Sequence, residues 1–451
     1  METEQKSLLF SKKALNKLIG PLVMEQILEV TVGMLDIVMI SGVGEAAVSG
    51  VSLVDNINIL LIGLFGALAT GGAVVAGHYL GQGNKEQACK AANQIVLFVV
   101  VSSIAIMILY LLGKNFILRV VFGNIDPDVE SAANTYLIIT GLSIPALALY
   151  NGCTALFRTM GNSKVTMWIS FIMNVIHAAG NVILIFEMQM GVAGAAISTT
   201  IARYAAAAII MVMLFNKKNT IHLDRKTFEF RFHKSMISRI LYIGIPTGLE
   251  NSIFQLGKIL ILSLVSACGT YAIAANAVAG NLATLNVIPG NAMSLALLSV
   301  VSVCIGANDF EQAKYYTKKL MVKIHIYTGV ISMVLILLSP MIVKIYQLSP
   351  HASSSAKVLI CLHAVCAMLF WPEAFVLPNT LRASNDVKFT MGIAIFSMWA
   401  FRIAASYLLV MQFNMNIVGV WIAMVIDWLF RAIVFVIRYL HGVWQTKYSD
   451  D

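Results

Sequence analysis

Apolar residues fill twelve long stretches of the chain, and short polar segments separate these stretches. Each stretch holds about 20 apolar residues, the length at which an α-helix crosses the hydrocarbon core of a bilayer. The pattern therefore predicts an all-α integral membrane protein with twelve transmembrane helices. The predicted spans are 18–40, 53–77, 94–112, 134–157, 165–186, 191–214, 240–266, 276–305, 320–343, 356–380, 390–412 and 415–440.

Composition supports this prediction. The chain is 59% hydrophobic and 12% charged, with a mean hydropathy of +0.82. A soluble domain carries about 25% charged residues, so this chain has half the charge that a water-facing surface needs. The six cysteines lie mostly inside or at the ends of the apolar stretches, and we interpret them as buried small side chains. Their spacing matches no common zinc motif.

The basic residues predict the topology. Of the Lys and Arg residues in the connecting segments, 22 fall on one side of the predicted membrane and 4 on the other. The basic side faces the cytoplasm, so we expect both termini, 1–17 and 441–451, to be cytoplasmic. The net charge of +9 is then a topology signal, and we expect no nucleic-acid partner.

The chain also repeats itself. A shift of 225 residues places PLVMEQ (21–26) on PTGLEN (246–251) and GQGNKEQA (81–88) on GANDFEQA (306–313). A shift of 224 places RTMGNSKVTM (158–167) on RASNDVKFTM (382–391). Such a nearly constant offset over six consecutive spans indicates a duplication.

The duplication predicts two homologous six-helix lobes, 18–214 and 240–440, joined by a cytoplasmic linker, 215–239. Because six is even, both lobes enter the membrane from the same side, which predicts a pseudo-two-fold axis along the membrane normal. Two such lobes are typical of a transporter that alternates access to a site near the midplane. No nucleotide-binding loop, HExxH or GxSxG motif points to an enzyme, and we expect no cofactor.

Three acids interrupt the first span. Glu25, Glu29 and Asp36 fall within about 40° of one another around a helix, on a stripe about 16 Å long. A carboxylate inside a membrane is costly and usually functional. The stripe could bind H⁺, Na⁺ or a cationic substrate. Alternatively, Glu25 could extend to the cytoplasmic interface, and Glu29 could pair with a basic neighbour.

Other ionisable residues lie within the predicted spans. Glu250 is the duplicate of Glu25, whereas the counterpart of Asp36 is the apolar Ile261. Asp427 and Arg431 are four residues apart, a spacing that predicts an intrahelical ion pair. The remaining members of the set are Arg203, Lys258, Glu373 and Arg402.

Five motifs in order along the chain resemble the multidrug and toxic compound extrusion (MATE) family. They are LDIVMISGVGEAAVSGVSL (35–53), GHYLGQGNKEQA (77–88), RTMGNSK (158–164), GVAGAAIST (191–199) and LRASNDVKFTM (381–391). The resemblance runs nearly from end to end. It implies a V-shaped pair of six-helix lobes and cation-coupled antiport of organic compounds out of the cell.

The resemblance also implies site residues. Asp36 matches the coupling acid of the first helix. His177 and Asn181 occupy the fifth-span positions where family members often carry Asn and then Asn or Asp, so the histidine departs from the pattern. An imidazole titrates near pH 6.5 when unperturbed. In the second lobe, Glu250 and Glu373 resemble a seventh- and tenth-span carboxylate pair in a shifted register, and Gln255 is a further polar candidate.

The sequence thus predicts a multidrug efflux antiporter of the cell membrane that exchanges cationic or amphipathic organic compounds for H⁺ or Na⁺. The alternative within the same superfamily is a lipid-linked saccharide flippase, which usually has extra spans or a strongly basic central cavity. The carboxylates favour cationic cargo. We expect a monomer in contact with membrane lipids, and no metal beyond the possible Na⁺.

Overall fold

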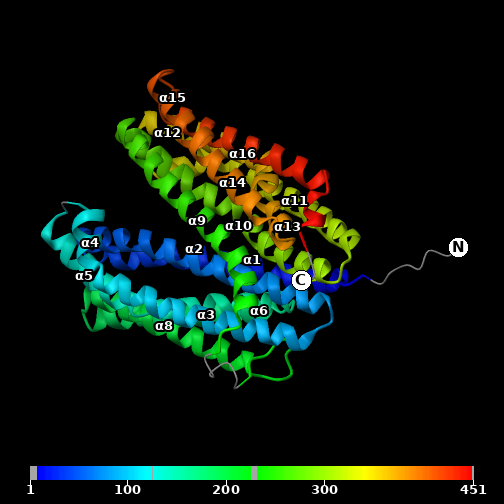
Figure 1. Cartoon of the computed structure of the whole chain (residues 1–451). Coiled ribbons are helices and arrows are strands. Elements are labelled where there is room, and N and C mark those ends of the chain that lie inside the picture. Colours follow the sequence, from blue (N-terminus) through cyan, green and yellow to red (C-terminus); the bar gives the residue numbers. More distant parts are fainter. Residues whose placement is uncertain (1–7, 124, 225–230, 449–451) are drawn as a thin grey trace. The chain divides into compact units, whose positions relative to one another are not determined.

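The computed structural model describes residues 8–123, 125–224 and 231–448, and the regular elements in these ranges are helices (Figure 1). Parts of the predicted linker and of both terminal segments lie outside these ranges. The elements up to the linker are α1 (Lys12–Ser41), α2 (Glu45–Gly81), α3 (Lys85–Leu112), α4 (Lys114–Phe116), η1 (Ile117–Val121), α5 (Pro127–Gly141), α6 (Ile144–Thr159), α7 (Ser163–Asn181), η2 (Val182–Glu187) and α8 (Gly191–Leu214).

The second half of the chain repeats this order of long helices. Its elements are α9 (Lys234–Ala267), α10 (Thr270–Gly306), α11 (Phe310–Ile345), α12 (Pro350–Trp371), η4 (Pro372–Val376), α13 (Pro378–Ala383), α14 (Val387–Ser397), η5 (Met398–Ala404), α15 (Ala405–Met411), α16 (Asn416–Leu440) and η6 (Val443–Thr446).

The helices confirm the predicted all-α membrane fold. In the described part of the chain, ten helices are long and apolar enough to cross a membrane, and the bent pair α5–α6 raises the number to eleven. The helix α1 has 30 residues and runs without a break through Pro21. Each of the twelve predicted spans therefore lies within a helix or a run of adjoining helical segments.

The fourth predicted span, 134–157, is broken. The helices α5 and α6 meet at an angle of 51° around Leu142 and Ser143. Pro145 lacks a backbone N–H, so it begins a helix more readily than it continues one. Tyr204 and Arg203 of α8 compensate for the break, because Tyr204 Oη donates to the Leu142 carbonyl and Arg203 Nη1 donates to Ser143 Oγ, both at 2.8 Å.

The chain divides into two compact units. The first runs from Lys12 to Gly248, and the second contains the chain from Leu249 onward together with the described residues 8–11. The N-terminal residues join the second unit through α11, because Tyr316 Oη accepts from Phe10 N and donates to Phe10 O, each at 2.9 Å. The division falls within α9. The lobe boundaries drawn from sequence remain predictions.

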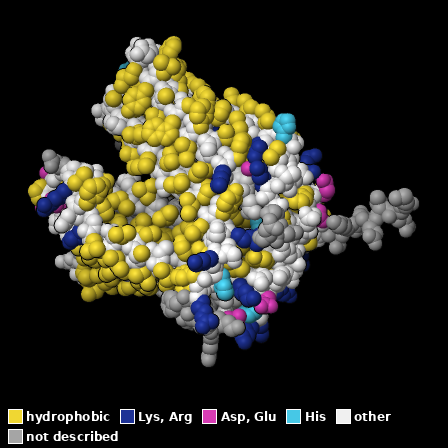
Figure 2. Space-filling view, viewed as in Figure 1, with side chains coloured by type: hydrophobic (Ala, Val, Ile, Leu, Met, Phe, Trp, Pro, Cys, Tyr) yellow, Lys and Arg dark blue, Asp and Glu magenta, His cyan; other side chains and the backbone are white. Residues whose placement is uncertain are grey.

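The surfaces of the helices are apolar. Figure 2 shows hydrophobic side chains over most of the visible surface, with charged side chains gathered in patches. The exposed fraction reaches 77% for Leu112, 76% for Leu337 and 72% for Val212. Soluble proteins rarely expose so much contiguous apolar surface. These side chains are suited to face lipid.

Several spans contain a π-helical stretch, in which backbone hydrogen bonds join residues five apart. Examples are the 2.9 Å bond from Met188 N to Ile183 O in η2 and the 3.0 Å bond from Leu377 N to Pro372 O in η4. Such stretches often occur at functional sites. In this chain they lie directly after Asn181, around Glu373 and around Arg402.

Candidate functional site

Asp36 lies between α1 and α7 of the first unit. Its Oδ1 atom accepts a 3.0 Å hydrogen bond from Asn181 Nδ2 and lies 3.5 Å from His177 Nδ1. The structure therefore brings together the three first-lobe residues that the family resemblance selects. The Asp36 side chain keeps 30% of its surface exposed, whereas Asn181 is fully buried.

Asn181 has one unused hydrogen-bonding atom at this site. Its Oδ1 atom is buried and has no hydrogen-bond partner. A buried acceptor without a partner costs about 1–3 kcal/mol, and such an atom in a native structure calls for an explanation. The amide oxygen lies on the same side chain that holds Asp36. The site therefore has a place for a donor or a cation next to a carboxylate.

The helix α8 fixes the position of His177. Thr199 Oγ1 lies 3.0 Å from His177 Nε2, and Ser198 Oγ donates a 2.7 Å hydrogen bond to the His177 carbonyl. Gly180 permits this close approach, since a Cβ atom there would lie 2.5 Å from Ser198 Oγ. Small residues commonly allow such contacts between membrane helices.

A second acid, Asp55 on α2, was missed by the sequence analysis. Asn58 Nδ2 donates a 3.1 Å hydrogen bond to Asp55 Oδ1, and Tyr136 of α5 also hydrogen-bonds to this carboxylate. Asp55 and Arg203 both lie within electrostatic range of Asp36. We define Asp36, Asp55 and Arg203, with neutral His177 and Asn181, as the acidic cluster. It holds two carboxylates against one fixed cation.

The other acids of the first span have separate environments. Glu25 is buried, with Oε1 2.5 Å from Arg158 Nη2 and Oε2 accepting a 2.8 Å hydrogen bond from Thr166 Oγ1. Glu29 is exposed and accepts a 3.0 Å hydrogen bond from Gln26 Nε2. Glu25 is thus a buried ion-pair partner in this structure, because α6 and α7 cover it.

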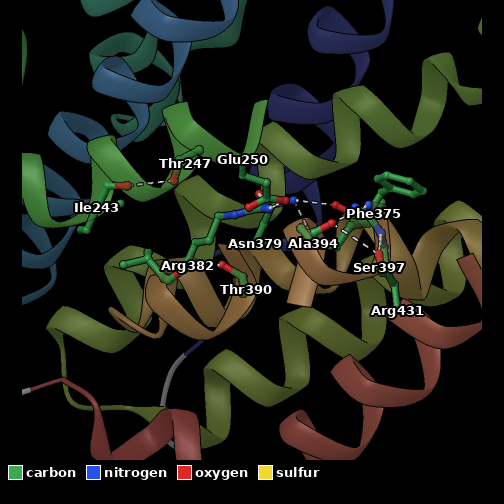
Figure 3. A network of polar contacts seen from close by, with 12 residues as sticks. Ile243, Thr247, Glu250, Phe375, Asn379, Arg382, Thr390, Ala394, Ser397 and Arg431 are labelled. Carbon is green, nitrogen blue, oxygen red and sulfur yellow. Dashed lines mark hydrogen bonds and ion pairs between the residues drawn. The ribbon is translucent and has the colours of Figure 1, made fainter. Parts of the chain in front are cut away.

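The second unit repeats the Glu25–Arg158 pair. Glu250 Oε1 lies 2.7 Å from Arg382 Nη2, and Arg382 Nη1 donates a 2.9 Å hydrogen bond to Asn379 Oδ1 (Figure 3). Glu25 and Glu250 are 225 residues apart, and their two arginines are 224 apart. The offset found in the sequence therefore relates two ion pairs of the same type.

The remaining second-lobe candidates do not share a site with Glu250. Glu373 Oε1 lies 3.0 Å from His325 Nε2 of α11. Gln255 is half-buried on α9, five residues after Glu250. Glu250 and Glu373 thus have different basic partners, so in this structure each acts within its own ion pair.

The described residues contain no group of three or more His, Cys, Asp or Glu side chains that could hold a metal ion. The oxygen atoms of Asp36 and Asn181 are nevertheless the ligand type that hard cations prefer. The site thus fits a single proton or Na⁺ better than a transition metal, which prefers imidazole or thiolate ligands.

Comparison with known proteins supports these relationships. The chain is 26% identical over 450 residues to the uncharacterized transporter YisQ of Bacillus subtilis strain 168, covering 96% of this chain and 95% of the relative. It is 22% identical over 450 residues to the probable multidrug resistance protein NorM of Thermotoga maritima, covering 97% and 94%.

A solved structure shows the same fold. It is the outward-facing conformation of a multidrug resistance MATE family transporter of the MOP superfamily, which superposes with a TM-score of 0.90 at 18% identity and covers 97% of both chains. The model of the MatE family matches residues 21–183 and again residues 246–408. The two matches lie 225 residues apart, which confirms the internal duplication. The chain belongs to the MatE family of membrane transporters.

Proposed function

We propose that this protein is a secondary active antiporter that exports small organic compounds, cationic or amphipathic, in exchange for H⁺ or Na⁺. In this proposal it is a monomer of the cell membrane, its termini face the cytoplasm, and alternating access of two lobes moves the cargo. Membership of a transporter family agrees with the prediction that the chain is not an enzyme. An ion gradient then supplies the energy, and no cofactor is required.

One observation carries the proposal: a partly exposed carboxylate, Asp36, beside the unpartnered amide oxygen of Asn181. A proton on Asp36 would give the carboxyl group an O–H that can donate to this oxygen. A Na⁺ ion would instead accept oxygen ligands from both side chains. Either ion would also reduce the excess negative charge of the acidic cluster. Loading and release of one cation would therefore change the hydrogen bonding between α1 and α7.

The curated relatives support organic cargo. NorM of Thermotoga maritima and YoeA of Bacillus subtilis are both named as probable multidrug resistance proteins. These names favour small-molecule efflux over the flippase alternative. The cationic preference was argued from carboxylates in both lobes, but Glu25 and Glu250 are paired with arginines. Asp36 is the carboxylate that still supports it.

A transport assay with imposed gradients tests the proposal. Purified protein in liposomes is loaded with a fluorescent organic cation, and either a proton or a Na⁺ gradient is imposed. We expect efflux with one of the two gradients, and an ionophore for that ion should abolish it. Efflux that ignores both gradients would contradict antiport. Lack of transport for cations, zwitterions and anions alike would contradict the efflux function.

A further inference from the structure

The second unit contains a group of basic side chains for which the coupling mechanism has no use. Arg402 lies on η5, Lys258 on α9, and Asp427 and Arg431 on α16. Arg431 Nε is 2.8 Å from Asp427 Oδ1, and Arg402 Nη1 is 3.6 Å from Asp427 Oδ2. We call these four residues the basic cluster. The ion pair expected from the i, i+4 spacing of Asp427 and Arg431 is confirmed.

The charges of the basic cluster do not balance. Asp427 is the one carboxylate that acts on Arg402, and the charged neighbour of Lys258 is Arg402 itself. Three cations therefore face one anion. The nearby acids Glu250 and Glu373 are already paired with Arg382 and His325. Uncompensated charge is expensive within a membrane and is usually functional.

Arg431 is held in place, whereas Arg402 is only weakly bound. Arg431 donates to Ser397 Oγ at 2.6 Å and to the Ala394 carbonyl at 3.0 Å (Figure 3). Ser397 Oγ also donates to Asp427 Oδ1. In contrast, Asp427 Oδ2, the oxygen nearest to Arg402, is buried without a hydrogen-bond partner. Arg402 keeps 13% of its side chain exposed, and Lys258 is exposed. These two cations remain available to a ligand.

Aromatic rings line the basic cluster. The Phe254 ring centroid lies 5.5 Å from Arg402 Cζ and 5.8 Å from Arg431 Cζ, and Phe375 lies 5.4 Å from Arg431 Cζ. Trp371 stacks on Phe375 with a centroid distance of 5.2 Å, and Trp428 contacts Phe375 edge-on at 6.1 Å. Guanidinium groups bind carboxylates and phosphates in a planar geometry, and flat rings favour aromatic ligands.

We propose that the basic cluster binds the anionic group of an aromatic amphipathic cargo, with Arg402 and Lys258 contacting a carboxylate or phosphate and Phe254 contacting the ring. The inference rests on the proposed function only in taking the ligand to be a transported solute. The cargo class then includes organic anions and zwitterions.

The first unit lacks this chemistry at the corresponding positions. At the 225-residue offset, Lys258 corresponds to Gly33 and Arg402 to His177. The duplication therefore supplies an internal comparison: one helical framework carries a carboxylate site in one copy and an excess of bases in the other. The unbalanced cations are thus a feature of the second copy and not a requirement of the repeated fold.

Equilibrium binding tests the inference without requiring coupled transport. Protein in bilayer discs of zwitterionic lipid is titrated with para-nitrobenzoate, whose nitro group quenches tryptophan, and the emission of Trp371 and Trp428 reports occupancy. We expect tighter binding of para-nitrobenzoate and para-nitrophenyl phosphate than of the cationic analogue para-nitrobenzylammonium. Arg402→Gln and Lys258→Met should each raise the Kd of the anions about tenfold, a loss of about 1.4 kcal/mol.

Controls separate a local effect from misfolding. Arg402→Gln leaves Asp427 paired with Arg431, so the fold should survive. Lys344→Met removes an exposed lysine of the same unit and should leave the Kd unchanged. Equal binding of anion and cation, or unchanged binding in both cluster variants, would overturn the inference. Full displacement of para-nitrobenzoate by anionic lipid in the discs would also overturn it, by assigning the cluster to a lipid headgroup. Asp36→Asn should abolish gradient-driven transport yet retain anion binding, so the two proposals can fail separately.

Discussion

The two copies of the repeat keep one ion pair and differ in the charge cluster. Glu25–Arg158 and Glu250–Arg382 have nearly the same N–O distance, 2.5 and 2.7 Å, at corresponding positions. The acidic cluster of the first unit holds more carboxylates than fixed cations, whereas the basic cluster of the second holds more cations. The repeated pair is suited to a structural role common to both lobes. The clusters that diverged are the better candidates for roles that differ, namely coupling in one and cargo recognition in the other.

The largest expected effect comes from Asp36→Asn. An amide cannot carry the negative charge that attracts H⁺ or Na⁺, so we expect gradient-driven efflux in proteoliposomes to fall to background. Glu29→Gln is the matched control, because Glu29 is an exposed acid on the same helix. Retained efflux in Asp36→Asn, or an equal loss in Glu29→Gln, would remove Asp36 from the coupling step.

The repeated ion pair should govern stability in both units. Glu25→Gln and Glu250→Gln each leave an arginine without its buried partner, and breaking a buried pair costs about 3–5 kcal/mol. We expect similar losses in the free energy of unfolding, measured by denaturant titration in detergent. The double variants Glu25→Gln/Arg158→Met and Glu250→Gln/Arg382→Met should recover most of the loss. Unchanged stability in the single variants would show that the pair is not structural.

Asn181→Ala should weaken the coupling ion by about tenfold. The variant removes both the donor to Asp36 and the buried oxygen that has no partner, and one such contact is worth about 1–2 kcal/mol. The readout is the ion concentration that gives half-maximal efflux. Asn379→Ala of the second unit is the control, since Asn379 bonds Arg382. An ion affinity unchanged in Asn181→Ala would exclude Asn181 as a ligand.

The smallest effect is expected for His177→Gln. The distance from His177 Nδ1 to Asp36 is 3.5 Å, longer than the Asn181 contact, so a change of about threefold in ion affinity is reasonable for one weak hydrogen bond. Thr199→Val tests whether the imidazole orientation matters, because it removes the Nε2 partner. A complete loss of transport in either variant would make His177 a central coupling residue.

Hydropathy predicted the spans because the bilayer requires long apolar helices. The repeat and the family resemblance together identified Asp36, His177 and Asn181, which the structure places in contact. Asp55 and Tyr136 escaped notice, since their convergence on one site depends on helix packing and leaves no periodic signal in the sequence. Arg158 and Arg382 were interpreted as topology signals, yet they are the partners of Glu25 and Glu250. The common offset of acids and arginines was the signal that could have linked them.

The π-helical stretches have a consequence for how such a protein diverges. A helix that gains one residue without breaking rotates all that follows by about 100° relative to what precedes. In the helical run from α14 through η5 to α15, Ser397 stands before the extra turn and Arg402 within it. Insertion or loss of a single residue there would present a different set of side chains to Phe254 while the length and depth of the span stayed almost the same. A duplicated transporter can in this way acquire a new ligand preference in one copy through a one-codon event, without rebuilding its helices.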